Sequence, residues 1–166
     1  KQVKNILAIC WGMQVAVTAA GGEVKKGQNG AHRGIAHDII INKDGLSHPI
    51  YKGKKEIFNT PAFNYDEVVT LPEKSVLLSS NKVNRVMGLN FKTEKSDIWG
   101  IQYHPEITYD KMITLIKFRK EKLINNKSFN DEADLISHIQ MIEKENKITN
   151  KESRMRELKN WLDLIG

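Results

Sequence analysis

The one cysteine of the chain, Cys10, stands where a catalytic nucleophile would have to stand. It follows the apolar run Ile6–Ile9 and precedes a helix-forming segment, Met13–Ala20, with Gly12 two positions after it. This order predicts a nucleophile elbow, a sharp turn from strand to helix that exposes one side chain. We expect Gly12 to lack a side chain because helix and strand approach each other there. The first helix amides would place partial positive charge near the sulfur and favour the reactive thiolate.

A histidine and a carboxylate that could serve such a nucleophile lie far downstream, in the run Trp99–Glu106. Residues two apart in a strand face the same side, so His104 and Glu106 are expected to form a pair. Pro105 favours an extended backbone at His104 and would preserve this geometry at the strand end. Together with Cys10 they would form a set of nucleophile, base and orienting carboxylate.

Each of these residues also has a simpler interpretation. A single cysteine in an apolar run is typical of a buried core residue, and a single histidine at a strand end is often a surface or core residue. The chemical interpretation depends on the joint occurrence of both runs in one chain.

The elements that would position these side chains follow from hydrophobic patterning and punctuation. Val3–Ile9 is predicted to be a buried strand, and the helix after Cys10 is predicted to end at Gly21-Gly22. The glycine- and proline-rich middle predicts short strands at Ile35–Ile41, Ser75–Ser80, Arg85–Phe91 and Ile98–Tyr103.

Helical spacing dominates the rest of the chain. It predicts helices over Tyr109–Leu123 and Asp131–Glu145, the second capped by Asn130, and a third over Ser153–Ile165. We expect their apolar stripes to pack on the domain, although a partner surface is an alternative. Lys25–Gly30 is expected to be a mobile surface loop, since it lacks the ending of a phosphate-binding loop.

Composition bounds the remaining possibilities. The chain has 166 residues, of which 40% are hydrophobic and 28% charged, as expected for one globular domain. The net charge of +6 comes from lysines scattered among acids, which favours a solvated surface over a nucleic-acid site. The apolar runs are too short for a membrane span. A single cysteine excludes an internal disulfide and fits a reducing compartment, so we expect a cytoplasmic protein. The five histidines show no metal-ligand spacing, so we expect no metal.

Two runs of the chain resemble the motifs of the class I glutamine amidotransferase family. These are Ala8–Gln14 around the cysteine and Tyr103–Glu106 around the histidine. Ala20–Val24 and Asp66–Pro72 resemble further family segments. The likeness is greatest to stand-alone members related to the amidotransferase domain of GMP synthase, in which a helical tail similar to Arg156–Leu162 follows the catalytic domain.

The resemblance implies an α/β fold, a flavodoxin-like open sheet with flanking helices, a nucleophile elbow and a helical C-terminal tail. Residues 1–106 would form the catalytic core, and residues 107–166 would be helices packing on the same domain. The catalytic residues implied are Cys10, His104 and Glu106, and no cofactor is implied. Trp11, Gln14, Tyr65 and Asp66 would bind substrate, with the Trp11 amide as an oxyanion donor.

The activity implied is hydrolysis of the side-chain amide of L-glutamine through a cysteine thioester. Glutamate would be released, and the ammonia would pass to an unidentified acceptor. The partner implied is an ammonia-accepting synthetase subunit. Two alternatives stay open: a γ-glutamyl hydrolase with the same catalytic set, and a non-catalytic regulatory relative. No nucleic-acid or membrane partner is expected.

Three departures from the family pattern matter. Ala8 replaces the usual glycine two residues before the nucleophile, and Asn64 stands where relatives often carry a histidine. The chain also starts at Lys1, without the roughly 75 to 90 residues that precede the elbow in relatives, so the core is expected to be N-terminally incomplete. Residues 1–166 alone would then be poorly stable, prone to associate through one side of Val3–Ile9, and nearly inactive toward glutamine.

Overall fold

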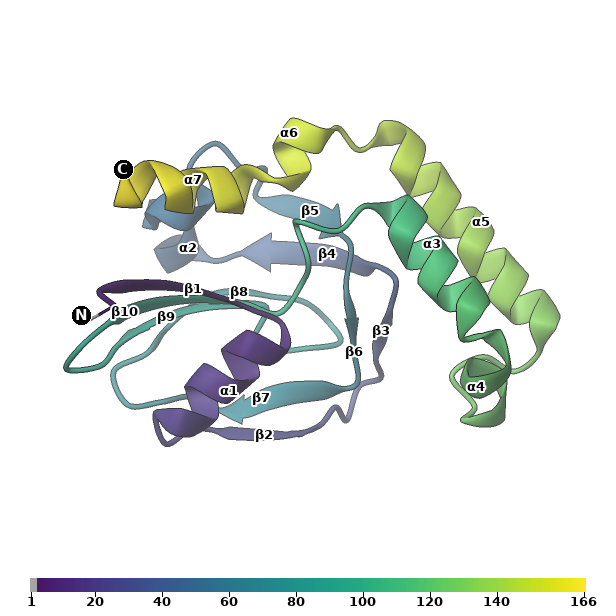
Figure 1. Cartoon of the computed structure of the whole chain (residues 1–166), viewed down its shortest axis with the longest axis horizontal. Helices are drawn as coiled ribbons and strands as arrows, with labels where there is room; N and C mark the ends of the chain where they lie inside the picture. Colours follow the sequence, from purple (N-terminus) through teal and green to yellow (C-terminus); the bar gives the residue numbers. More distant parts are fainter. Residues whose placement is uncertain (1–2) are drawn as a thin grey trace.

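A computed structural model describes residues 3–166. Lys1 and Gln2 lie outside the described residues, and the expectation about the start of the chain rests partly on them. The described residues form an α/β fold in which an open, curled sheet is flanked by helices (Figure 1). This is the fold class that the family resemblance implies.

The strands run in chain order through the first two thirds of the molecule. They are β1 (Asn5–Ile9), β2 (Glu23–Lys26), β3 (His32–Arg33), β4 (Ala36–Ile41), β5 (Ile57–Thr60), β6 (Phe63–Asn64), β7 (Asp66–Thr70), β8 (Val76–Ser80), β9 (Gly88–Lys92) and β10 (Asp97–Ile101). Six of them form one sheet in the order β1-β10-β9-β8-β4-β5, while β2 pairs with β7 and β3 with β6.

Within the main sheet, β1 pairs with β10 in parallel, and the other described pairs are antiparallel. Strand β1 stands at an end of the sheet order, and only Ala8 of its residues is buried. The predicted strand is present, but the prediction that it is buried is wrong. Among the described residues, one side of β1 has no neighbouring strand.

Two predicted strands are shorter in the structure. Strand β9 begins at Gly88 instead of Arg85, because the side chain of Asn81 accepts hydrogen bonds from the amides of Val83 and Asn84 and holds a turn there. Strand β10 ends at Ile101 instead of Tyr103, which leaves His104 outside the sheet.

The helices are α1 (Trp11–Ala19), α2 (Lys43–Ser47), the 3-10 turn η1 (Pro49–Tyr51), α3 (Tyr109–Phe118), α4 (Lys120–Asn125), α5 (Glu132–Ile148), α6 (Lys151–Arg154) and α7 (Arg156–Ile165). The predicted helix over Tyr109–Leu123 is thus two helices, separated at Arg119, whose backbone leaves the helical region at φ −98° and ψ 12°. The third predicted helix is likewise divided, at Met155.

The cap of α5 also differs from the expectation. Asp131, and not Asn130, is the N-cap, since its carboxylate accepts a hydrogen bond from the amide of Asp134. Asn130 donates its own backbone amide to the Asp134 carboxylate. A carboxylate at this position also interacts favourably with the helix dipole, which favours aspartate over asparagine.

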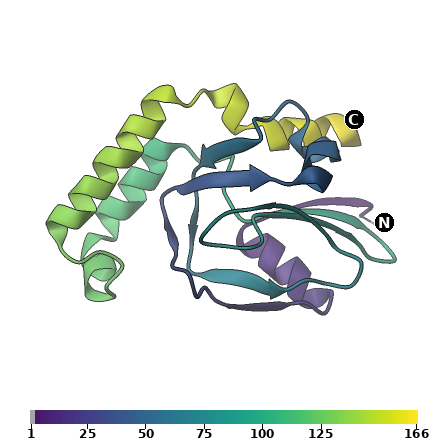
Figure 2. The ribbon, with the colours of Figure 1, turned by 180° about the vertical axis from the view of Figure 1, so that it is seen from behind.

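Helices α3 and α5 lie side by side beyond β3 and β6, as Figures 1 and 2 show from opposite directions. They contact the rest of the fold at Gly34, where a Cβ atom would come within 2.8 Å of both Ile116 and Ile142. Gly34 has a φ of 98°, which favours glycine for a second reason. His138 of α5 adds a hydrogen bond to the Arg33 carbonyl at 2.6 Å.

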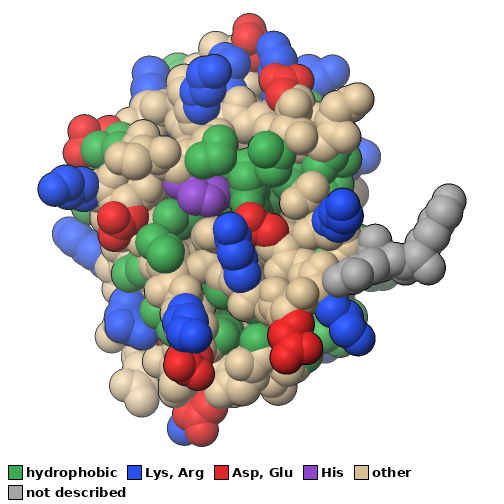
Figure 3. All heavy atoms as spheres, turned by 90° about the vertical axis from the view of Figure 1, so that its left-hand side faces the viewer, with side chains coloured by type: hydrophobic (Ala, Val, Ile, Leu, Met, Phe, Trp, Pro, Cys, Tyr) green, Lys and Arg blue, Asp and Glu red, His purple; other side chains and the backbone are tan. Residues whose placement is uncertain are grey.

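The opposite end of the molecule carries α7, which packs beside η1 (Figure 1). Trp161 contacts the main core cluster, and the Asn160 amide donates to the carbonyls of Ile50 and Lys52. Leu162 and Ile165, two apolar residues of the third predicted helix, stay exposed, so the expected packing of its apolar residues is only partial. Figure 3 shows this end of the molecule, where lysine and arginine side chains are interspersed with acidic ones.

Candidate active site

Cys10 occupies the turn between β1 and α1 in an uncommon backbone conformation. Its φ is 52° and its ψ is −113°, so it lies on the side of the Ramachandran map that residues other than glycine rarely adopt. The Cys10 amide donates to the Ile101 carbonyl at 2.7 Å, and its carbonyl accepts from Gln14 at 3.2 Å. A conformation of this kind costs on the order of 1–3 kcal/mol, and residues held in it cluster at active sites.

The glycine that lets helix α1 approach the sheet is Gly100, not Gly12. No atom lies within 4 Å of a Cβ built on Gly12, so the close approach predicted there is wrong. A Cβ on Gly100 would lie 2.7 Å from Cγ of Met13, because α1 crosses β10 at that point. Gly100 pairs with Ala8, so two small residues lie side by side beneath the helix.

His104 and Glu106 form a close pair in the loop after β10. Nδ1 of His104 lies 2.6 Å from Oε1 of Glu106. The prediction that strand alternation brings them together is wrong, because the loop turns here: the Ile107 amide donates to the His104 carbonyl at 3.2 Å. The His104 amide in turn donates to the carbonyl of Pro61 at 2.8 Å.

The electrostatic surroundings of His104 favour its charged form. Burial by itself lowers the pKa of His104, but hydrogen bonding and charge interaction with Cys10 and Glu106 outweigh it and raise the pKa to about 9. Since Nδ1 faces Glu106, Nε2 is the nitrogen left for Cys10. The structure thus brings together the three residues Cys10, His104 and Glu106.

Gln102 also contacts the sulfur, and sequence reasoning missed it. It is fully buried, and its side-chain amide donates to Sγ of Cys10 at 3.5 Å. Its carbonyl oxygen accepts from the Gln14 amide at 3.1 Å. The sequence feature that could have indicated Gln102 is its place in the run Trp99–Glu106, two residues before His104.

The four residues predicted to bind substrate divide between two hollows. Trp11, 74% exposed, borders one hollow on α1 together with Gln14 and Asp66. Tyr65 borders the other, again with Asp66, and its hydroxyl contacts that of Ser128 at 2.9 Å. The Gln14 amide is already engaged, since it donates to the Asp66 carbonyl at 3.0 Å as well as to Gln102.

Asn64 points into the protein and not toward a substrate pocket. It is buried, and its amide donates to the Asp66 carbonyl and to Asn84, both at 2.9 Å. Its oxygen lies 2.8 Å from Nδ1 of His32, whose pKa is lowered by burial, so a neutral His32 donates this bond. Asn64 therefore supports the backbone at Asp66, whose carbonyl also accepts from Gln14.

Within residues 3–166, no group of three or more histidine, cysteine, aspartate or glutamate side chains is placed to hold a metal ion. No helix in the same range is long and apolar enough to cross a membrane.

Residues 1–121 match the family described as "Glutamine amidotransferase class-I". The chain therefore belongs to the class I glutamine amidotransferase family, as its two motifs indicate.

Individual relatives differ in what their names say they do. A gamma-glutamyl-L-1-hydroxyisopropylamide hydrolase of a Pseudomonas species is 28% identical over 181 residues, covering 95% of this chain and 60% of that protein. The glutamine-hydrolyzing GMP synthase of Thermotoga petrophila is 31% identical over 130 residues, covering 76% of this chain and 24% of that protein.

Among solved structures, a glutamine amidotransferase of Thermotoga maritima has a TM-score of 0.69 at 19% identity, covering 95% of this chain and 62% of that one. This likeness confirms the fold. The chain spans less than two thirds of the length of each of these three proteins.

Proposed function

We propose that the protein hydrolyses γ-glutamyl amides, with the side-chain amide of glutamine as substrate and Cys10 as nucleophile. One observation carries the proposal: Cys10 is held in a left-handed turn beside the paired His104 and Glu106. Packing alone gives no reason for a cysteine in that strained conformation. A reactive thiol, in contrast, needs partial exposure and a neighbouring histidine that favours the thiolate.

The resting state follows from the protonation of His104. With a pKa of about 9, the imidazole is charged at neutral pH. An imidazolium next to Cys10 stabilises a thiolate, the form that attacks carbonyl carbon. Glu106 accepts from Nδ1 and holds the ring so that Nε2 faces the sulfur.

The reaction proceeds in two halves. The Cys10 thiolate forms a bond to the amide carbon, and the carbonyl electron pair moves onto oxygen. As the tetrahedral intermediate collapses, the carbon–nitrogen bond breaks, and the imidazolium of His104 gives its proton to the leaving ammonia. Neutral His104 then takes a proton from water, which attacks the thioester. Glutamate leaves, and the thiolate and imidazolium are restored.

The oxyanion and the rest of the substrate need partners as well. The backbone amide of Trp11, the first residue of α1, is the proposed oxyanion donor. Trp11, Gln14, Tyr65 and Asp66 are proposed to bind the glutamyl group. Gln14 would act partly by fixing Asp66 and Gln102, since its amide already contacts both.

A second candidate has a specific observation behind it. The relative that covers 95% of this chain is named as a hydrolase of a substituted γ-glutamyl amide. The same thioester chemistry would apply, with an amine leaving in place of ammonia. The relative named as a glutamine-hydrolyzing GMP synthase supports glutamine as the substrate instead. In that case we propose that the ammonia passes to a synthetase subunit as acceptor.

The test uses the protein expressed from its complete gene. Glutamate release is measured with glutamine and with γ-glutamyl alkylamides, for the wild type, Cys10→Ala and Cys10→Ser. The exposed Glu152→Gln is the control for mutation as such. We expect release in the wild type and control only. The preferred substrate, judged by kcat/KM, separates the two candidates.

Two results would contradict the proposal. Glutamate release that persists in Cys10→Ala would exclude Cys10 as nucleophile. A folded wild-type protein that binds glutamine or a γ-glutamyl amide but releases no glutamate would favour the third possibility, a non-catalytic regulatory relative.

A further inference from the structure

The loop that carries His104 and Glu106 lies outside the sheet. Strand β10 ends at Ile101, and α3 does not begin until Tyr109. Backbone hydrogen bonds tie the loop at its start and at His104, but no backbone bond joins Pro105 or Glu106 to the sheet among the described residues. Yet catalytic geometry tolerates little movement, since a displacement of about 1 Å can cost about 100-fold in rate.

Arg154, the last residue of α6, supplies the missing support on one side of the loop. It is buried, and its Nη1 donates to the carbonyl of Pro105 and, at 3.0 Å, to that of Ile107. One guanidinium nitrogen therefore holds the carbonyls on both sides of Glu106.

Glu157 of α7 holds the residue that precedes His104. It is fully buried and accepts a hydrogen bond from the Tyr103 hydroxyl at 2.6 Å. Burial raises the pKa of Tyr103, so the hydroxyl stays protonated and donates. Glu157 is paired with Lys54, whose ammonium lies 2.9 Å away and is itself buried.

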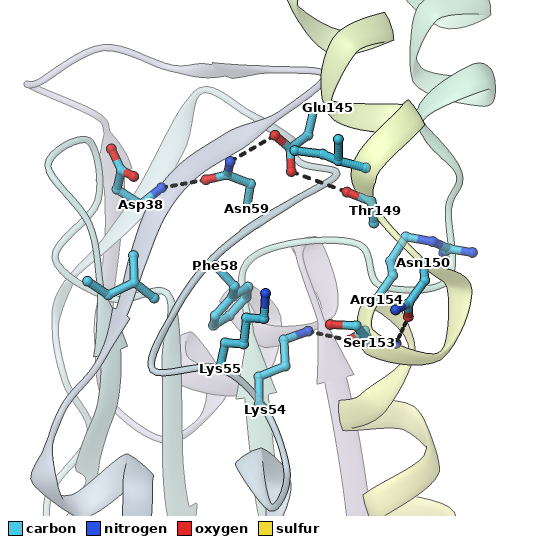
Figure 4. Close-up of a pocket in the computed structure, with 12 residues that line it drawn as sticks. Asp38, Lys54, Lys55, Phe58, Asn59, Glu145, Thr149, Asn150, Ser153 and Arg154 are labelled. Atoms are coloured by element: carbon cyan, nitrogen blue, oxygen red, sulfur yellow. Dashed lines mark hydrogen bonds between the residues drawn. The ribbon is translucent and has the colours of Figure 1, made fainter.

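The helical segment that supplies these two side chains is itself tied to the sheet side of the molecule. Figure 4 shows Lys54 reaching the carbonyl of Ser153, at 2.8 Å, and Asn59 of β5 contacting Glu145 of α5, at 3.0 Å. Arg154 lies in the same cleft between β5 and the C-terminal helices. The segment is therefore a fixed support and not a loose tail.

Buried charges of this kind are a poor way to stabilise packing, because well-packed apolar residues often do as well or better. The two charged side chains here contact one short loop: Arg154 binds backbone carbonyls of the loop, and Glu157 binds the Tyr103 side chain. We propose that Arg154 and Glu157 are positioning residues that hold the Tyr103–Ile107 loop at two points and thereby keep His104 and Glu106 in register with Cys10.

The proposal rests on the proposed function, so its test needs a readout that does not depend on turnover. The rate at which iodoacetamide alkylates Cys10 at pH 7 reports the thiolate that His104 stabilises. Peptide mapping assigns the adduct to Cys10, the one cysteine of residues 1–166. This rate is measured per folded molecule, alongside kcat and KM for glutamate release.

The variants are Arg154→Met, Arg154→Lys, Glu157→Gln and Tyr103→Phe, in the protein from its complete gene. Matched controls on the same helical segment are Arg156→Lys, which keeps the positive charge, and Glu152→Gln, whose carboxylate is exposed; the two side chains form an ion pair with each other. Tyr103→Phe removes one oxygen atom, so it keeps the test available when a charge variant fails to fold.

We expect Arg154→Met and Glu157→Gln to lower both kcat and the alkylation rate on the order of 10- to 100-fold, with KM changed by less than about threefold. Arg154→Lys should recover part of the loss, Tyr103→Phe should lose several-fold, and both controls should match the wild type. Folded variants that lose thermal stability but keep the wild-type alkylation rate and kcat would overturn the proposal. A wild type that releases no glutamate, combined with lower alkylation in the variants, would instead contradict the proposed function alone.

Discussion

The side-chain amide of Gln102 donates a hydrogen bond to the sulfur of Cys10 across 3.5 Å. The same side chain accepts from Gln14, so it links the thiol to the segment proposed to bind substrate. An amide donor aimed at sulfur stabilises a thiolate more than a neutral thiol.

We therefore predict that Gln102→Glu, which keeps the shape but replaces the donor with a carboxylate, lowers the Cys10 alkylation rate at pH 7 by roughly 10- to 100-fold, because a hydrogen bond to a charged group is worth about 1.5–3 kcal/mol. Glutamate release should fall with it. Gln140→Glu on the exposed surface of α5 is the matched control. Unchanged alkylation in folded Gln102→Glu would show that the contact has no influence on the thiol.

Glu106→Gln tests the orientation of His104. Removing the carboxylate charge should lower the pKa of His104 from about 9 toward its ordinary value, because one of the interactions that raise it is lost. The rate of glutamate release should fall by about 100- to 10,000-fold, as in other triads. An NMR titration of the imidazole measures the pKa, with the exposed Glu73→Gln as control. A His104 pKa that stays at the wild-type value would refute this role of Glu106.

The stability of the protein should depend on pH through His104. Its folded-state pKa, about 9, lies above the unfolded value of 6.5, so its contribution is fully present below pH 6.5 and is lost as pH rises through 9. The full contribution is at most on the order of 3 kcal/mol. Urea unfolding at pH 6 and pH 9.5 should show this loss in the wild type and a smaller one in His104→Gln. An equal loss in both would contradict it.

Two glycines near the site should respond in opposite ways to alanine. Gly12→Ala places a methyl group in open space within α1 and should stabilise the fold by about 0.5–1 kcal/mol. Gly100→Ala places one 2.7 Å from Met13 and should cost roughly 1–3 kcal/mol. Thermal melts of both variants measure the change in stability. A stable Gly100→Ala and a destabilised Gly12→Ala would restore the interpretation of Gly12 as the close contact.

Much of this arrangement could be predicted from the residues themselves. The order of residues in the sequence is enough to predict the strand, turn and helix around Cys10, because apolar residues, a glycine and helix formers follow one another there. The pairing of His104 with Glu106 was also predicted, but for the wrong reason, because a turn and not strand alternation creates it. The two-residue period of strands and the 3.6-residue period of helices do not describe irregular loops.

Other features depend on contacts between distant segments and leave no local signal. The close approach at Gly100 exists only because α1 packs against β10, and Gln102, the residue after β10, contacts the sulfur only in the folded chain. Asn64, which stands where relatives often carry a histidine, points inward because His32 and Asn84 are its buried hydrogen-bond partners. The contacts of Arg154 with the loop after His104 likewise join residues that the sequence keeps far apart.

The central claim, a covalent γ-glutamyl intermediate on Cys10, is tested most directly by intact-mass spectrometry with peptide mapping. The protein from its complete gene is incubated with a diazo-ketone analogue of glutamine, with and without excess glutamine. The account predicts one adduct per chain, located on Cys10, whose formation glutamine slows and Cys10→Ser abolishes. An adduct on any other residue, or no adduct on a protein that still releases glutamate, would contradict it.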